Sequence, residues 1–244
     1  MKMCQLKSGI VLKDRIFMPD YDSHSEMLEE LGIKDDYLGA SKKFVRVELS
    51  PADGDVFSNI DEWKLKVDQD IKPDWFSEEE YKPMIIEAVK EWAKKHIHIG
   101  VDNLKIAEGE NHYIKDCANV EVYGNATVER VYGNATVKYV YGNATVKYVY
   151  GNATVKYVCE NATVKYVCEN ATVERVCENA TVNEVYGNAT VISSPYTKWN
   201  NANSIILADN ATFKDNYGKV IYQSGNYKLI SVESGKTIGE GVKG

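Results

Sequence analysis

The chain of 244 residues lacks an apolar stretch long enough to cross a membrane, which takes about 18 consecutive apolar residues. Its charged start, Met1 to Lys7, leads into no continuous apolar segment of the kind that secretion signals contain. Its cysteines number five, and an odd number does not suit a disulfide framework. These absences predict a cytoplasmic protein with free thiols and without a membrane partner.

A strong charge of one sign is also missing from the middle of the chain. The net charge is −7, but residues 118–192 hold six Lys and Arg against seven Glu, so the acidic excess lies in residues 1–117. A nearly neutral segment offers neither a basic surface that could bind the phosphates of a nucleic acid nor an acidic surface that could mimic them. We therefore expect no nucleic-acid partner.

What the chain does contain is a nonapeptide repeat, V-Y-G-N-A-T-V-x-x, over residues 122–191. Its asparagine recurs every nine residues and is each time followed by Ala-Thr-Val: Asn125, Asn134, Asn143, Asn152, Asn161, Asn170, Asn179 and Asn188. Two nonapeptides together give a coil of about 18 residues, which has room for side chains inside. Ala and Val are then expected inside, Thr outside, and Gly-Asn at the turns, because Gly and Asn tolerate positive φ.

An antiparallel meander, in which two-residue Gly-Asn hairpins join seven-residue strands, is the alternative. Glu160, Glu169 and Glu178 replace the Gly, and Glu is disfavoured at the positive-φ position of such a turn. A single-layer meander would also leave an apolar face uncovered. We therefore predict a β-solenoid of stacked parallel coils over residues 101–192, with residues 122–191 as its core.

The segment before the repeats predicts a small acidic α+β domain over residues 1–100. Two motifs in which Ser precedes Glu by three residues predict helix starts at Ser23 and Ser77. The second helix is expected to reach about Lys95, because apolar residues recur along it at helical spacing. Strands are expected where β-prone or alternating residues occur, at 10–12, 15–17, 44–49 and 63–67.

Residues 193–244 are expected to form a C-terminal cap and a mobile tail. The rhythm of the repeat returns loosely at Asn201 and Asn210, which predicts two degenerate final turns. The apolar runs at 220–222 and 227–230 predict a hairpin. Such an atypical end would keep the open solenoid from polymerising.

The Ala-x-Val-Tyr-Gly-Asn runs resemble the hexapeptide-type β-solenoid repeats of bacterial and phage proteins. With Pro19–His24 before them and Ser193–Asn201 after them, the Asn-Ala-Thr-Val nonapeptides look like those of an uncharacterised family from gut bacteria and their mobile elements. The resemblance implies a solenoid but no activity. Hexapeptide acyltransferases use a His on the solenoid, and residues 122–191 contain none. Acyl transfer and a cofactor are therefore not expected.

The outward ladders of side chains are the main candidates for a function. Tyr and Lys recur side by side at positions that should face solvent: Tyr139, Tyr148, Tyr157, Tyr166, Lys138, Lys147, Lys156 and Lys165. Tyr beside Lys or Arg is a common composition of protein-binding surfaces. The alternative is that the ladders only stabilise the stack of coils, Tyr on Tyr and Thr on Thr. We predict a surface for a protein partner or for self-association.

Histidines offer a weaker candidate for a metal site. The i, i+2 spacing of His96 and His98 puts two rings on one face of a strand, and His112 or Cys117 could complete a zinc site. A helix end followed by an edge strand explains the same spacing, so no metal is predicted.

Three cysteines take the place of Tyr in one column of the repeat. In a coil of 18 residues, Cys159 and Cys177 are expected to stack in adjacent coils, with Cys168 on the opposite side. The position suits a half-buried side chain of either type, and no thiol cluster is implied.

The missing catalytic constellation and the repeated Tyr and Lys favour a non-enzymatic binding or scaffold protein, encoded by a phage or mobile element and acting on a host factor. The alternative is an enzyme or toxin-like activity in residues 1–100, with the solenoid as a spacer or oligomerisation element. Asp20, Tyr21, Asp22 and His24 form the one dense polar cluster in that segment.

Overall fold

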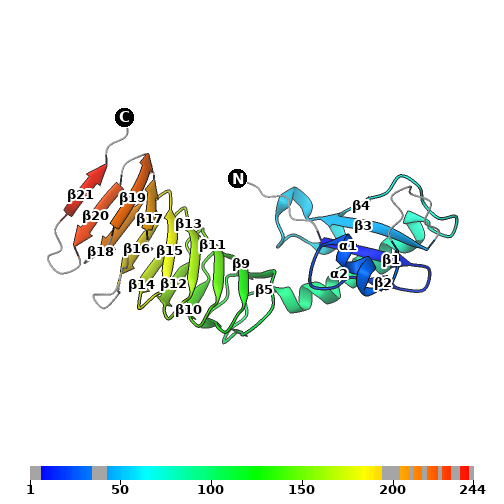
Figure 1. Cartoon of the computed structure of the whole chain (residues 1–244), viewed down its shortest axis with the longest axis horizontal. Coiled ribbons are helices and arrows are strands. Elements are labelled where there is room, and N and C mark those ends of the chain that lie inside the picture. The colour runs from blue at the N-terminus through cyan, green and yellow to red at the C-terminus, as the bar shows by residue number, and fades with distance from the viewer. Residues whose placement is uncertain are drawn as a thin grey trace. The chain divides into compact units, whose positions relative to one another are not determined.

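A computed structural model describes residues 7–34, 43–193, 204–208, 211–215, 219–224, 227–231 and 237–241. The chain divides into two compact units, Met1–Ile97 and His98–Gly244. Figure 1 shows a small antiparallel sheet with two helices in the first unit and a stack of parallel strands in the second. Within the described residues, neither helix has the length and apolar character needed to cross a bilayer.

The first unit is built on a four-stranded antiparallel sheet with the order β2-β1-β3-β4. Its strands are β1 (Lys7–Leu12), β2 (Ile16–Phe17), β3 (Phe44–Ser50) and β4 (Lys64–Val67). All four predicted strands are therefore confirmed. In β3 the side chains alternate, so that Val45 and Val47 are fully buried while Arg46 and Glu48 are partly exposed, as expected for a strand with two unlike faces.

Helix α1 (His24–Glu30) begins where the sequence predicted, because the Ser23 side chain accepts a hydrogen bond from the Glu26 backbone N–H at 3.3 Å. Its buried Met27 and Leu28 belong to one apolar cluster with Ile10 of β1 and Phe44 of β3. Helix α1 therefore packs on the face of the sheet that also carries Glu48, since Phe44 and Glu48 are four residues apart on one strand.

Helix α2 (Glu78–His96) also has the predicted extent and begins after Ser77 as predicted, but the Ser77 side chain makes no capping hydrogen bond, so the predicted capping box is not formed. Three glutamates in the first turn and Lys94, Lys95 and His96 in the last turn suit the helix dipole instead. The helix packs near β2 and near a 3₁₀ turn at Ile60–Glu62. Lys90 of α2 forms an ion pair with Asp61 of that turn, with 2.6 Å between Nζ and Oδ1. A second 3₁₀ turn occupies Ala52–Gly54.

The second unit is a β-solenoid, as predicted. From β5 to β20, the odd-numbered strands form one parallel sheet and the even-numbered strands the other. The strands up to the end of the repeats are β5 (Ile97–Ile99), β6 (Lys105–Ile106), β7 (His112–Lys115), β8 (Val120–Val122), β9 (Thr127–Tyr132), β10 (Thr136–Val140), β11 (Thr145–Val149), β12 (Thr154–Val158), β13 (Thr163–Val167), β14 (Thr172–Val176), β15 (Thr181–Val185) and β16 (Thr190–Ser193). Thr136 pairs with Thr154 and Thr145 with Thr163, so one coil holds two nonapeptides.

Along the repeats, the core of the solenoid consists of Ala and Val from every nonapeptide, which are fully buried. Within one strand the buried valines are three residues apart, as in Val137 and Val140. Strict alternation would put only one residue between two inward side chains. Here two consecutive residues, Lys138 and Tyr139, lie between the buried valines and are at least partly exposed.

The turns correct one premise of the sequence argument. Glu160, Glu169 and Glu178 adopt φ of 60°, 60° and 57°, the same left-handed region as the glycines they replace. The carboxylates of two of them offset part of this backbone strain: Glu160 Oε2 accepts a hydrogen bond from the Gly142 N–H, and Glu169 Oε2 from the Gly151 N–H, each at 2.9 Å. The predicted solenoid is confirmed, but the argument that Glu does not adopt positive φ at these turns is wrong.

The segment after the repeats continues the solenoid with β17 (Ser204–Ala208), β18 (Thr212–Asp215), β19 (Lys219–Ser224) and β20 (Tyr227–Ser231). Strands β17 and β18 pair in parallel with β15 and β16, so the solenoid continues beyond the repeats, whereas Asn201 and Asn210 lie outside the described residues. The predicted hairpin is wrong, because β19 pairs with β17 and β20 with β18, in opposite sheets. Consecutive strands such as β19 and β20 are half a coil apart, so each pairs with the strand two before it and not with the other.

The last described strand, β21 (Thr237–Gly241), pairs antiparallel with β20. It covers the edge of the even-numbered sheet, as a terminal unit of a solenoid is expected to do (Figure 1). The predicted mobile tail, Glu233 to Gly244, is wrong for 237–241, which form β21, and its residues 233–236 and 242–244 lie outside the described residues.

Candidate functional site

The structure divides the eight predicted surface residues between the two sheets. Tyr139 and Tyr157 pair across β10 and β12, whereas Tyr148 and Tyr166 pair across β11 and β13. Each tyrosine follows its own lysine. We call Lys138, Tyr139, Lys156, Tyr157 and Arg175 the even face, and Lys147, Tyr148, Lys165 and Tyr166 the odd face. Residues nine apart lie in opposite sheets, so the predicted single surface consists of two.

On the even face the rings of Tyr139 and Tyr157 stack with 5.3 Å between centroids. Two cations flank this stack: Lys138 Nζ lies 5.3 Å from the Tyr139 ring, and the Arg175 guanidinium lies 5.4 Å from the Tyr157 ring. Both distances are within the range of cation–π attraction. The even face therefore presents a short aromatic stack with positive charge at both ends.

The odd face has a similar stack but a different charge pattern. Tyr148 and Tyr166 lie 4.8 Å apart between ring centroids. Lys147 pairs with Glu129 of the preceding coil at 2.6 Å, so part of its charge is neutralised. Partial burial, followed by the neighbouring Tyr166, raises the pKa of Tyr148. The stacking confirms that the Tyr columns support the coils, whatever else they bind.

The corners carry the other Tyr column, in which the cysteines also lie. Tyr123 stacks on Tyr141 at 5.2 Å between ring centroids, and the same corner continues with Cys159 and Cys177. Burial and the neighbouring Cys177 raise the pKa of Cys159 to about 12. Cys168, at the opposite corner, has a pKa raised by burial to about 11. The thiols of Cys159 and Cys168 are therefore protonated and poorly nucleophilic near neutral pH.

The two histidines of the predicted His96-x-His98 pair do not meet. His96 is buried, stacks on Trp92, and has its Nε2 2.9 Å from Asp20 Oδ1. His98 instead contacts His112, with 3.4 Å between His98 Nε2 and His112 Nδ1. Two ring nitrogens at this separation are explained by one N–H···N hydrogen bond.

Cys117, the other residue considered for that site, has a fully buried side chain whose Sγ donates to the His98 carbonyl oxygen at 3.3 Å. Burial raises the pKa of this thiol. The residue is part of the solenoid core.

The polar residues near the start of α1 also turn to separate partners. Asp20 faces His96, and the Tyr21 hydroxyl donates to Glu30. Asp22 Oδ1 accepts from the buried Lys7 ammonium at 2.5 Å and from the Ser8 N–H at 3.1 Å. These contacts fix the segment before α1 on the sheet and do not converge on one reacting point.

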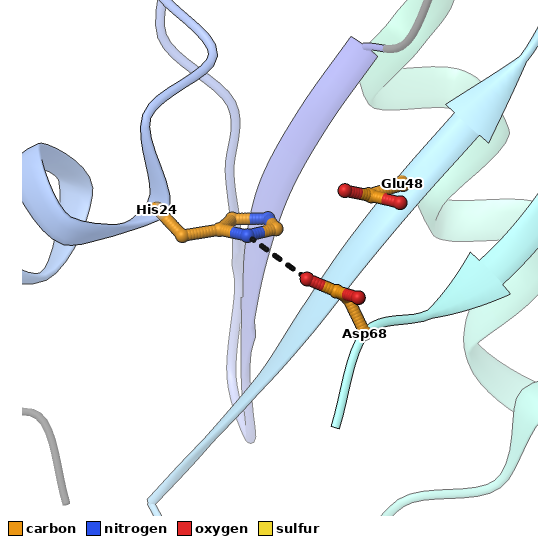
Figure 2. A group of neighbouring side chains, drawn as sticks. All are labelled: His24, Glu48 and Asp68. Carbon is orange, nitrogen blue, oxygen red and sulfur yellow. Dashed lines mark ion pairs between the residues drawn. The ribbon is translucent and has the colours of Figure 1, made fainter. Parts of the chain in front are cut away.

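His24, the fourth residue of that cluster, belongs to a group that the sequence analysis missed (Figure 2). It lies beside Glu48 of β3 and Asp68, the residue after β4, and one ligand-type atom from each of the three lies within 4.8 Å of the others. His24 Nδ1 is 3.8 Å from Asp68 Oδ2, and His24 Nε2 is 3.2 Å from the Val47 carbonyl oxygen. We call His24, Glu48 and Asp68 the sheet triad.

A lysine neutralises the carboxylates of the sheet triad. Lys66 Nζ lies 3.0 Å from Glu48 Oε2 and 2.9 Å from Asp68 Oδ1. These hydrogen bonds raise the pKa of Lys66, and the bond from Lys66 is the main cause that lowers the pKa of Asp68. The Lys66 side chain is 64% exposed, so its ammonium is held at the edge of the site.

The triad depends on a pairing that the sequence does not state. Glu48 lies opposite Lys66 in the antiparallel register of β3 and β4, and Asp68 is two residues further along, on the same face. The alternation of residues 44–49 and 63–67 indicated both strands but not their register. If β3 and β4 had been assumed to be neighbours, the opposite charges of Glu48 and Lys66 would have indicated the register that places these two residues across from each other.

The chain was compared with protein-family models, curated proteins and solved structures, and none of them matches. The solenoid and the antiparallel sheet therefore rest on the structure itself. The relation to a gut-bacterial and phage family stays a prediction from the sequence.

Proposed function

We propose that this chain is a non-enzymatic binding or scaffold protein whose solenoid presents its even face to a protein partner. The observation that carries the proposal is the Tyr139–Tyr157 stack with Lys138 and Arg175 at its ends. Tyr and Arg dominate the binding energy of many protein interfaces, because their rigid side chains bury a large area at little entropic cost.

The rigidity of the scaffold supports the same proposal. The strands beneath the even face are held by a fully buried Ala and Val core, so the positions of the Tyr side chains are fixed before binding. A preformed surface loses less conformational entropy when a partner binds. The resemblance of the repeats to those of phage and gut-bacterial proteins favours a host protein as the partner, inside the cytoplasm that the sequence predicts.

The test uses a photo-crosslinking amino acid in place of Lys138, in the full chain expressed in its source cells. The captured protein is then purified, and its affinity for the unmodified chain is measured by calorimetry. We expect Tyr139→Ala with Tyr157→Ala to weaken binding at least tenfold. Tyr123→Ala with Tyr141→Ala is the matched control, because it removes a similar ring stack from a corner. Equal losses from both pairs would show that only stability is affected.

The odd face is a built-in comparison for that experiment. Its Tyr148–Tyr166 stack resembles that of the even face, but Glu129 neutralises Lys147. If Tyr148→Ala with Tyr166→Ala weakens binding and the even-face pair does not, the partner binds the opposite sheet. If neither pair changes the affinity for any captured protein, the ladders serve only the stack.

The alternative, an enzyme or toxin-like activity in residues 1–100, gains no support from Asp20, Tyr21 and Asp22, since each is engaged with a different partner.

A further inference from the structure

We propose that the sheet triad, His24, Glu48 and Asp68, is a binding site for a divalent transition-metal ion of the Zn²⁺ class. One imidazole and two carboxylates from three separate elements are a set of donors that Zn²⁺ accepts, with water in its remaining position. Their ligand-type atoms lie within 4.8 Å of one another. Two donors on one tetrahedral zinc ion are about 3.4 Å apart. Side-chain rotations that move the ligand atoms by less than about 1.5 Å would therefore bring them to zinc-binding separations.

The orientation of the His24 ring is the first argument. Its Nε2 lies 3.2 Å from the Val47 carbonyl oxygen, which can only accept, so Nε2 carries the proton and donates. In the neutral ring, Nδ1 then holds a lone pair, and it faces Asp68 Oδ2 at 3.8 Å (Figure 2). Two acceptors face each other favourably only with a cation or a proton between them. Metal-binding histidines show this same arrangement, with the outer nitrogen bound to a backbone carbonyl.

The position of Lys66 is the second argument. Its ammonium contacts both carboxylates of the triad, so the two acids already form a cation site. The Lys66 side chain is mostly exposed and its stem is flexible, so it can turn into solvent when an ion of higher charge enters. His24 and Glu48 are largely shielded, with 13% and 16% of their side chains exposed, whereas Asp68 is 40% exposed. The Asp68 side therefore admits the ion and its water.

The experiment titrates ZnCl₂ into the full chain under reducing conditions and follows the ring nitrogens of His24 by two-bond ¹H–¹⁵N spectra. We expect the Nδ1 signal of His24 to shift on addition of one equivalent of zinc. In calorimetry, His24→Gln and Asp68→Asn should each weaken binding at least tenfold. Lys66→Met should tighten it at least threefold, because the competing ammonium is gone.

Zinc can also meet the thiols and the His98–His112 pair, so a second background is needed. His98→Gln with His112→Gln should leave the shift of His24 unchanged. The proposal is overturned if the His24 ring signals do not move with zinc, or if Lys66→Met fails to tighten binding. A triad that only stabilises the fold would lose stability in Lys66→Met without gaining affinity for zinc. Circular dichroism establishes that each variant is folded. Because Asp68 is the most exposed residue of the triad, Asp68→Asn should disturb the core least.

Discussion

The Glu160 carboxylate accepts a hydrogen bond at 2.9 Å from the backbone N–H of Gly142, the equivalent turn residue one coil earlier. This contact explains how a side chain enters a left-handed position, since the bond offsets part of the strain. It also makes the turn an inter-coil contact.

The balance at this turn can be measured. Glu160→Ala removes the hydrogen bond but keeps a Cβ at φ 60°, and should lower the free energy of unfolding by about 1 kcal/mol. Glu160→Gly also removes the strain of about 1–2 kcal/mol, and should be close to neutral. Urea denaturation followed by circular dichroism measures both, with the outward Glu174→Ala as the control. The explanation fails if Ala and Gly are equally destabilising.

The central coil offers a test of core packing. Val155 is fully buried between neighbouring coils. Val155→Ala should cost about 2 kcal/mol, because two buried methyl groups are lost and a cavity remains. Lys156→Ala, at the next residue and on the outer side, should change stability by less than about 0.5 kcal/mol. The comparison uses the denaturation midpoint at a constant m-value, and equal effects of the two changes would contradict the inward position of Val155.

Thiol reactivity provides a third prediction. Because burial raises the pKa of Cys168 from 9.0 to about 11, its thiolate fraction at pH 8 falls by roughly 100-fold. Iodoacetamide should therefore modify Cys168 roughly 100-fold more slowly in the folded chain than in urea. Peptide mapping by mass spectrometry gives the rate for this residue alone. A folded-state rate close to the unfolded one would show that the corner is open to solvent.

The sheet triad predicts a dependence of stability on acid. Hydrogen bonding from Lys66 lowers the pKa of Asp68 below its ordinary value of 3.8, so the folded state binds this proton less strongly than the unfolded state. The resulting stability is present above about pH 4 and is lost as the pH falls through the lowered pKa. The effect is small, because Asp68 is 40% exposed.

The measurement compares the free energy of unfolding of the parent chain with that of Asp68→Asn at pH 7 and at pH 2.5, without added metal. The advantage of the parent chain at pH 7 should be smaller at pH 2.5, which lies below the ordinary Asp pKa of 3.8. In a Lys66→Met background the pH 7 advantage should already be smaller. An advantage as large at pH 2.5 as at pH 7 would mean that the carboxylate is not its source.

The sequence predicted the repeats better than their surroundings for a physical reason. Each Ala and Val recurs at a fixed interval, so one inference about direction holds for every coil. The Tyr139 and Tyr148 columns were nevertheless predicted as one surface, although the same interval of nine puts them on opposite sheets. Residues 220–230 were predicted as a hairpin, because a short apolar–turn–apolar run looks alike in a hairpin and in a solenoid turn.

The sheet triad could not be predicted, since it joins residues that are 24 and 20 positions apart in the chain and depends on the register of β3 and β4. Single segments reveal a strand, but a site between strands requires their alignment. The partner of His96 was missed for the same reason, because Asp20 is 76 residues away. His112 was named beside His98, but as a possible metal ligand and together with His96, which turns elsewhere.

Both nonapeptides of a coil have the same inward residues. The packing of the core is therefore the same whichever of the two sheets a given nonapeptide joins. Removal or insertion of 18 residues would change only its length, by about 4.8 Å per coil. Removal or insertion of nine would keep every buried Ala and Val in place and yet transfer each downstream side chain to the other sheet. Unequal recombination within such a gene could therefore exchange the surfaces of the distal half in one step, without passing through an unstable protein.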